Sequence, residues 1–234
     1  MLEVSGLGGG YGSLQVLWEV ELHVGEGESV LLLGANGAGK STLLRTLVGL
    51  QPRRGGRVTF RGTRIEGLST HQRIRRGISF MSEAGVFTGL SVEENLLLGG
   101  YSLPPESARA RAQELLETFP DLARFRHQPA AALSGGQRKM LGVAKAFMAG
   151  PRLLVMDEPS SGLSPRFVGE VLRMLARIRA GGASLLVAEQ NIRFLEIADR
   201  VYIVDGGRIS FHGTVEEVRA NRAIRQAYFG LKGA

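Results

Sequence analysis

Cysteine is absent from this sequence of 234 residues, and its absence excludes three kinds of chemistry. A disulfide framework, a thiolate metal site and a thiol nucleophile all need cysteine. The composition is compatible with a reducing compartment, so we expect the protein to work in the cytoplasm.

Long apolar runs are missing as well. No window approaches the ~20 apolar residues that a membrane-spanning helix needs, and the start, MLEVSGLGGG, lacks the order of a signal peptide. At 44% hydrophobic residues the chain can still bury a core, so disorder is not expected. We therefore predict a single soluble domain, for which any role at a membrane requires a partner.

Lysine is scarce, occurring only at positions 40, 139, 145 and 232, so the net charge of +7 comes almost entirely from arginine. A basic surface can indicate nucleic acid or an anionic membrane face as the partner. The alternative is an arginine-rich composition spread over ordinary solvated faces. We favour this spread and expect no specific nucleic acid, because arginines cluster only in residues 53–64 and 73–76, without interleaved aromatic residues.

The order of the predicted elements is that of an α/β protein. Apolar runs predict strands at residues 28–33, 58–60, 77–81, 153–157, 184–188 and 201–205. Helical spacing and N-cap residues predict helices at residues 40–50, 106–119, 165–179 and 191–198. Strands that alternate with helices form a parallel sheet through right-handed crossovers. The stretch from Ser91 to Gly150 is predicted to be a helical insertion, with Ser91 and Glu94 as a capping box.

A glycine-rich stretch, GANGAGKS at residues 34–41, lies between a predicted strand and a predicted helix and matches the phosphate-binding loop in full. Its glycines let backbone N–H groups surround phosphate oxygens at the positive end of a helix. Lys40 would reach the β and γ phosphates, and Ser41 would ligate Mg²⁺. A glycine-rich hairpin with an incidental lysine is the alternative, and the flanking elements argue against it. The predicted ATP-binding residues are Gly34, Ala35, Asn36, Gly37, Ala38, Gly39, Lys40, Ser41 and Thr42.

Two acids, Asp157 and Glu158, follow the buried strand at residues 153–157. They emerge at the carboxyl end of the strand, which is where α/β sheets bind ligands. Asp157 would hold Mg²⁺, and Glu158 could polarise the attacking water as a general base. The alternative, a strand that simply ends in solvated acids, is disfavoured by the glycine-rich loop in the same chain.

LSGGQ, at the start of another predicted helix, comprises Leu133, Ser134, Gly135, Gly136 and Gln137. The glycine-rich loop, LSGGQ and the paired acids, in this order, resemble the nucleotide-binding domain of ABC transporters over the whole chain. The resemblance implies a P-loop NTPase fold with a RecA-like parallel sheet core and an N-terminal antiparallel β lobe. Residues 1–82 and 151–234 would form this core and lobe, and about 84–150 would form an inserted helical subdomain.

In that family LSGGQ of one subunit binds the γ-phosphate that the glycine-rich loop of the other subunit holds, so two domains enclose two ATP molecules. The resemblance therefore implies a second ABC ATPase subunit, identical or different, as a partner. It also implies integral membrane permease subunits and, indirectly, a periplasmic or extracellular solute-binding protein. The chain would then lie at the inner face of the cell membrane.

Four positions bear on the details of the site. Tyr11 stands where the family stacks an aromatic ring on adenine, although an aromatic residue in the β lobe needs no such role. Glu83 stands where the family has a glutamine; it could ligate Mg²⁺ or orient water, but adds negative charge. Gln190 replaces a histidine and could bind the γ-phosphate without titrating. Ser164 stands where an aspartate is common.

Taken singly, these departures could mark a nucleotide sensor with slow hydrolysis. Together with VFTGLSVEEN at residues 86–95 and GGRISFHGT at 206–214, they resemble the smaller ATPase subunit of branched-chain amino-acid uptake systems, one residue being missing between Glu83 and Val86. We expect an ATP-hydrolysing importer subunit for branched-chain or other hydrophobic amino acids. The alternatives are a system for another substrate, such as urea or lipopolysaccharide, and an ABC ATPase acting on nucleic acid or ribosomes, against which the single loop argues.

Overall fold

A six-stranded sheet forms the centre of the protein in the computed structural model, which describes residues 1–83 and 85–229. The five strands in the order β9-β3-β8-β7-β6 are parallel, and β10 joins their edge antiparallel to β9. Their bounds are β3 (Ser29–Leu33), β6 (Ile78–Met81), β7 (Leu153–Asp157), β8 (Ser184–Glu189), β9 (Arg200–Asp205) and β10 (Arg208–Thr214). The predicted parallel sheet is confirmed, with each of its five predicted strands ending within one residue of its expected bounds.

The parallel strands are apolar throughout because both of their faces are buried. In β3, Leu31 and Leu33 face one hydrophobic cluster, whereas Val30 and Leu32 face a second cluster on the other side of the sheet. This arrangement turns a strand into a continuous apolar run. β10 alternates between exposed and half-buried residues, and it was not among the predicted strands.

A second sheet, with the order β2-β1-β4-β5, forms an antiparallel lobe built mainly from the start of the chain. Its strands are β1 (Leu2–Tyr11), β2 (Leu14–Val24), β4 (Arg57–Phe60) and β5 (Thr63–Arg64). A Cβ atom on Gly9 would lie 2.9 Å from Oγ1 of Thr46, so glycine at this position lets the helix α1 (Lys40–Leu47) approach β1 closely. The antiparallel lobe implied by the resemblance is confirmed.

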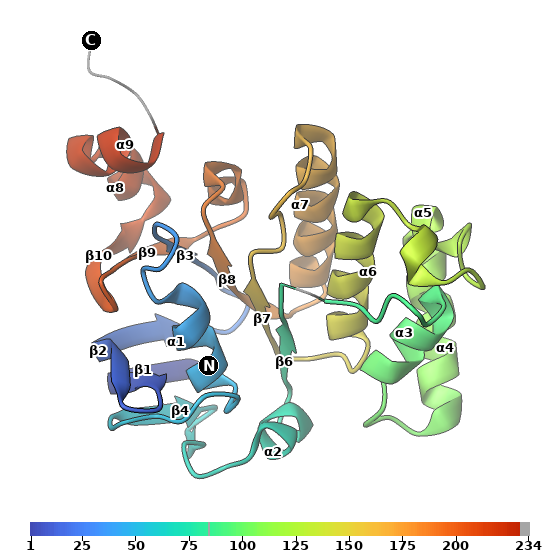
Figure 1. Ribbon diagram of the computed structural model, residues 1–234, viewed down its shortest axis with the longest axis horizontal. Helices are drawn as coiled ribbons and strands as arrows, with labels where there is room; N and C mark the ends of the chain where they lie inside the picture. Colours follow the sequence, from blue (N-terminus) through green and yellow to red (C-terminus); the bar gives the residue numbers. More distant parts are fainter. Residues whose placement is uncertain (84, 230–234) are drawn as a thin grey trace.

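Helices cover both faces of the large sheet (Figure 1). The helix α1 packs between the two sheets, while α6 (Gly135–Phe147) and α7 (Pro165–Ala180) cover the opposite face. The remaining helices are α2 (Thr70–Arg75), α3 (Val92–Gly99), α4 (Pro105–Thr118), α5 (Pro120–Ala123), α8 (Val215–Ala220) and α9 (Arg222–Phe229), with 3₁₀ turns at Ala130–Ala132 and Ile192–Glu196.

Two helix predictions need correction. The helix expected at 40–50, with Gly49 and Pro52 marking its end, stops at Leu47; Val48 is its C-cap, and Gly49 follows with φ 81°. The helix expected at 191–198 is a short 3₁₀ turn, with the side chain of Asn191 capping its start. The capping box of Ser91 and Glu94 is present as predicted, at the start of α3.

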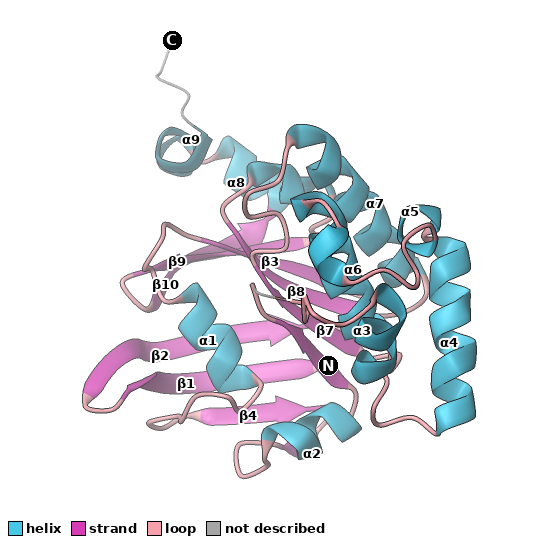
Figure 2. Cartoon of the chain, turned by 45° about the vertical axis from the view of Figure 1, so that its right-hand side comes forward, coloured by secondary structure: helices cyan, strands magenta, loops and turns pink. Residues whose placement is uncertain are grey.

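The helices α3, α4, α5 and α6 lie together at one side of the molecule (Figure 2). They occupy the stretch that the resemblance assigns to a helical subdomain; the first residue of that stretch, Ala84, lies outside the described residues. No helix in the described part of the chain has the length and apolar character needed to cross a bilayer.

Candidate nucleotide site

The glycine-rich loop links the end of β3 to the start of α1, as predicted. Gly37 and Gly39 adopt φ 79° and 106°, values that favour glycine, and a Cβ atom on Gly34 would collide with the carbonyl oxygen of Val204. Gly39 is the N-cap of α1 and offers no side chain to the free N–H groups of the first turn. These N–H groups therefore remain available to an anion at the positive end of the helix.

A pocket of about 410 Å³ opens over this loop. It brings the loop together with two acids that are distant in the sequence, and its lining residues are Val16, Asn36, Gly37, Gly39, Lys40, Ser41, Thr42, Glu83, Glu158 and Ser161. Six of the predicted loop residues thus share one cavity with Glu83 and Glu158, while Gly34, Ala35, Ala38 and Asp157 are not part of its lining. Val16, which lies on β2, was not predicted.

Lys40 is almost completely buried at the floor of this pocket, with 4% of its side chain exposed. Its Nζ atom donates hydrogen bonds to the carbonyl oxygens of Gly34 at 2.7 Å and Ala35 at 3.0 Å. Burial lowers the pKa of Lys40, while the carboxylates of Glu158, Asp157 and Glu189 act in the opposite direction. The ammonium group is therefore fixed beside the loop, where a phosphate would supply the charge partner that burial demands.

Asp157 and Ser41 meet at the other side of the loop. The Ser41 hydroxyl donates to Oδ1 of Asp157 at 2.8 Å, although 116 residues separate them in the sequence. Burial raises the pKa of Asp157, opposed mainly by this hydrogen bond. A hydroxyl and a buried carboxylate side by side are hard oxygen donors, the ligand type that Mg²⁺ prefers.

Glu158 has an unusual backbone conformation for a residue with a side chain, φ 48°. Its N–H donates to the carbonyl oxygen of Ala188 at 2.9 Å, which anchors the turn after β7 to β8. Non-glycine residues held in this region of conformational space concentrate at functional sites. The turn aims the Glu158 carboxylate at the pocket, with Oε1 3.8 Å from Nζ of Lys40.

Gln190 bridges the acid and the glycine-rich loop. Its Nε2 atom donates to Oε1 of Glu158 at 2.8 Å and to Oδ1 of Asn36 at 2.6 Å. Both amide hydrogens are therefore used, and Gln190 forms a neutral link between Glu158 and Asn36.

Two residues that were not predicted support the acids. Lys139 of α6 donates from Nζ to the carbonyl oxygens of Glu83 at 3.0 Å and Glu158 at 3.1 Å, and burial lowers its pKa. Glu189 is buried at the end of β8 and accepts hydrogen bonds from the N–H groups of Ser160, Gln190 and Asn191. The only sequence signal for Glu189 was its place directly after a predicted buried strand. Lys139 had no signal, because a single lysine in a helix is not distinctive.

Tyr11 ends β1 beside the loop helix, and its ring is 41% exposed. The Thr42 hydroxyl donates to the phenol oxygen of Tyr11 at 3.3 Å. Tyr11 is not among the residues that line the pocket. Its side chain thus stands next to the site, at a place where it could cover a base.

LSGGQ forms the first turn of α6 but lies outside the phosphate pocket of its own chain. Ser134 is the N-cap and forms a capping box with Gln137, and it is exposed. A Cβ atom on Gly136 would overlap the ring of Phe167 on α7, so that glycine serves packing. A Cβ atom on Gly135 would meet nothing within 4 Å, so no internal contact requires this glycine.

Comparisons with known proteins agree with this geometry. Residues 17–161 match the ABC transporter family. The chain is 38% identical over 222 residues to the high-affinity branched-chain amino acid transport ATP-binding protein BraG of Pseudomonas aeruginosa, covering 94% of this chain and 95% of that protein. It is 35% identical to the lipopolysaccharide export system ATP-binding protein LptB of Escherichia coli, covering 98% and 97%. Among solved structures, a nucleotide-free ATP-binding cassette from an ABC transporter superposes with a TM-score of 0.86 at 25% identity, covering 100% and 99%.

Proposed function

Because this chain belongs to the ABC transporter family, as one of its ATP-binding ATPases, we propose that it energises a membrane importer for branched-chain or other hydrophobic amino acids. Its similarity to BraG supports the substrate class. LptB, at 35% identity, keeps a lipopolysaccharide exporter as the second candidate. The observation that carries the enzymatic part is the contact of Gln190 with both Glu158 and Asn36, which joins the proposed base to the proposed phosphate loop.

In the proposed reaction, the loop N–H groups and Lys40 hold the β and γ phosphates of ATP. Glu158 takes a proton from a water molecule as the water oxygen attacks the γ-phosphorus, and the bond from that phosphorus to the bridging oxygen of ADP breaks. Gln190 orients the Glu158 carboxylate, and Lys139 holds the peptide carbonyl of the same residue. Tyr11 would stack on the adenine.

Mg²⁺ is the metal that this site fits. Ser41 and Asp157 would hold it, with Glu83 as a further oxygen donor in the same pocket. When bound, Mg²⁺ neutralises phosphate charge as it develops during transfer. Within the described residues no three His, Cys, Asp or Glu side chains converge on one point, which suits an ion whose remaining ligands are phosphate and water oxygens.

Two copies of such a domain, or this chain and a related one, would complete each site. LSGGQ does not reach the phosphate pocket of its own chain, yet it presents a helix N-terminus with an exposed Ser134 and an unobstructed Gly135. That combination suits a phosphate presented by a second subunit. The residues from Leu133 to Gln137 would therefore act across the dimer interface.

A groove of about 280 Å³ is the proposed docking place for the membrane permease. We call it the apolar groove; Leu50, Leu98 and Tyr101 line it and are 55%, 41% and 53% exposed. Ser82 and Gly85, which flank the segment of Glu83, also line it, so a partner seated there would touch the chain next to the site. The domain would thus work at the inner face of the membrane, and a solute-binding protein would act on it only through the permease.

Uptake in the protein's own cells tests the proposal. Deleting the gene should abolish uptake of labelled leucine, isoleucine and valine; wild type should restore it and Glu158→Gln should not. Normal amino-acid uptake in the deletion strain would overturn the substrate class, and a failure of lipopolysaccharide export would select the second candidate. Phosphate release from the purified chain with its permease, measured alongside, tests the ATPase separately.

A further inference from the structure

The net charge of the protein is concentrated in one short segment. Residues 53–76 contain eight arginines, no lysine and a single acid, Glu66. This segment alone accounts for the net charge of +7, because the rest of the chain has 21 basic and 21 acidic residues. The two arginine clusters noted in the sequence thus lie in the one segment whose basic residues are not balanced by acids.

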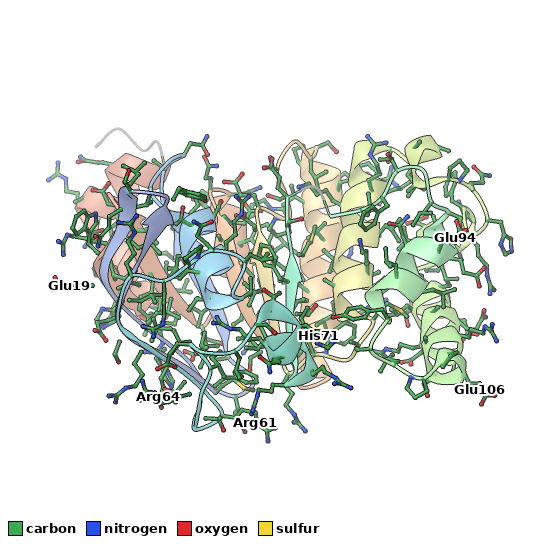
Figure 3. All side chains as sticks on the ribbon, turned by 60° about the horizontal axis from the view of Figure 1, so that its bottom comes forward. Glu19, Arg61, Arg64, His71, Glu94 and Glu106 are labelled. Carbon is green, nitrogen blue, oxygen red and sulfur yellow. The ribbon has the colours of Figure 1, made fainter. Side chains whose placement is uncertain are left out.

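Seven of these arginines are exposed, and together we call them the basic face. The face covers the loop after α1, the β4–β5 hairpin and the end of α2, and it comprises Arg53, Arg54, Arg57, Arg61, Arg64, Arg75 and Arg76. Figure 3 shows Arg61 and Arg64 directed outwards from the hairpin.

The two other charged residues of the segment are turned inwards. Arg73 is 5% exposed and donates to the carbonyl oxygens of Thr46, Leu47 and Leu68, so it anchors α2 to the end of α1. The Glu66 side chain is 5% exposed and pairs with Arg64 at 2.7 Å. Glu66 thus offsets the charge of one member of the basic face, Arg64, and the segment has no further acid to oppose the other six.

The basic face adjoins the apolar groove. Thr70 and Ile74 of α2 and Leu50 of the preceding loop line that groove. Arg75 is the last residue of α2, and Arg76 is its C-cap. Figure 1 shows α2 and β4 at one end of the molecule, with α8 and α9 at the other. If the permease occupies the groove, the basic face points towards the same membrane.

We propose that the basic face binds the anionic phospholipid headgroups that surround the permease. The inference rests on the proposed function only for the orientation of the groove. Guanidinium groups form paired hydrogen bonds with phosphate, and clusters of four to eight basic residues suffice to hold a protein segment at an anionic surface. Nucleic acid is the less favoured partner, because the segment's only Phe, Tyr or Trp is Phe60, which is buried, so no ring is available for base stacking.

Sedimentation of the purified full-length chain with vesicles tests this proposal without any permease. The test variant carries Arg57→Gln, Arg61→Gln, Arg75→Gln and Arg76→Gln. The control variant carries Arg109→Gln, Arg124→Gln, Arg219→Gln and Arg222→Gln, four exposed arginines outside the basic face. Both variants lower the net charge from +7 to +3, so they differ only in where the charge is removed.

Wild type should bind vesicles that contain phosphatidylglycerol and not vesicles of phosphatidylcholine alone, and added salt should weaken the binding. Each basic residue at such a surface contributes about fivefold, so the test variant should bind roughly several hundredfold more weakly. The control variant, and a variant with lysine at the four test positions, should bind nearly as well as wild type.

Three outcomes would overturn the proposal. These are no binding of wild type to phosphatidylglycerol vesicles, an equal loss of binding in the two glutamine variants, or tighter binding of labelled duplex DNA than of the vesicles at the same ionic strength. None of the four test positions belongs to the nucleotide pocket, so ATP hydrolysis by the test variant should match wild type. If the wild-type protein does not hydrolyse ATP, the proposed function is contradicted. The vesicle-binding result does not depend on ATP hydrolysis and would remain valid.

Discussion

The phosphate loop and LSGGQ are both glycine-rich segments that start a helix, yet they differ in how fully their own chain completes them. Around the loop, Lys40, Ser41 and Gln190 are already bonded to neighbouring groups of the same domain. At LSGGQ, by contrast, Ser134 is exposed and Gly135 has open space beside it. The difference fits the proposed dimer, in which the loop would be the finished half of each site and LSGGQ the half presented to the other subunit.

The largest expected effect on ATP hydrolysis comes from a substitution in the half of the site that the chain completes by itself. Glu158→Gln keeps an acceptor oxygen for Gln190 but cannot take a proton, so phosphate release should fall by about 10²–10⁴. ATP affinity, measured by fluorescent nucleotide binding, should stay close to wild type because Lys40 and the loop are untouched. Glu106→Gln, on the exposed start of α4, is the matched control and should leave both quantities unchanged. Equal hydrolysis by Glu158→Gln and wild type would exclude Glu158 as the base.

A substitution in LSGGQ, the half presented to the other subunit, should lower ATP hydrolysis nearly as much. Gly135→Asp places a carboxylate where the partner's phosphate is proposed to lie, so hydrolysis should drop by roughly 10²–10³ while ATP binding to the single chain persists. A mixture of Gly135→Asp and Lys40→Ala chains can form dimers with one intact site, although each variant alone is inactive. Recovery of phosphate release on mixing is the expected result, and a mixture that stays inactive would contradict a site shared between subunits.

Loss of the Gln190 side chain, which links Asn36 of the loop to Glu158, should lower hydrolysis less than the two changes above. Gln190→Ala removes two hydrogen bonds, and a loss of roughly tenfold in hydrolysis is expected. Gln190→His would introduce a group with a pKa of about 6.5, so a pH dependence absent from wild type should appear between about pH 6 and 7. A pH–rate profile of wild type that already bends in this range, and keeps its bend in Gln190→Ala, would show that another group titrates there.

The smallest expected effect concerns stability. Burial raises the pKa of Asp157, so its ionisation at neutral pH costs folding free energy. Asp157→Asn should therefore unfold at a temperature a few degrees higher than wild type at pH 7, although it should lose hydrolysis. This gain should disappear as the pH falls through the folded-state pKa towards 3.8, the ordinary value. Melting curves at both pH values measure it, and a variant less stable at pH 7 would contradict the assigned cost of burial.

The finished half was the easier half to predict from the sequence. β3, the loop and α1 are consecutive, and strands buried on both faces leave continuous apolar runs. Contacts between segments that are distant in the sequence produce no comparable pattern of residues. Lys139 lies 56 residues from Glu83 and 19 from Glu158, and only the packing of α6 against the sheet brings them together. The basic face was missed for the same reason, since two arginine clusters became one surface only when α2 was placed beside the β4–β5 hairpin.

Helix ends were also decided by context that a single sequence does not reveal. Residues 191–198 have helical spacing, but the N–H groups at its start bond to the buried carboxylate of Glu189. This fixes the chain in a cap and a 3₁₀ turn. The helical preference of the segment was overruled by the need to satisfy the buried carboxylate of Glu189, which takes its hydrogen bonds from the next two residues.

The position of Lys139 on α6 has a consequence for the timing of the two nucleotide sites. In the proposed dimer, the first turn of α6 touches the ATP of the partner, while five residues later Lys139 holds the peptide carbonyls of Glu83 and Glu158 in its own site. Five residues of helix span only about 7.5 Å and do not bend easily. In that dimer, a nucleotide that binds at one end of α6 would shift the proposed general base at the other end, so the occupancy of one site would influence the geometry of the other.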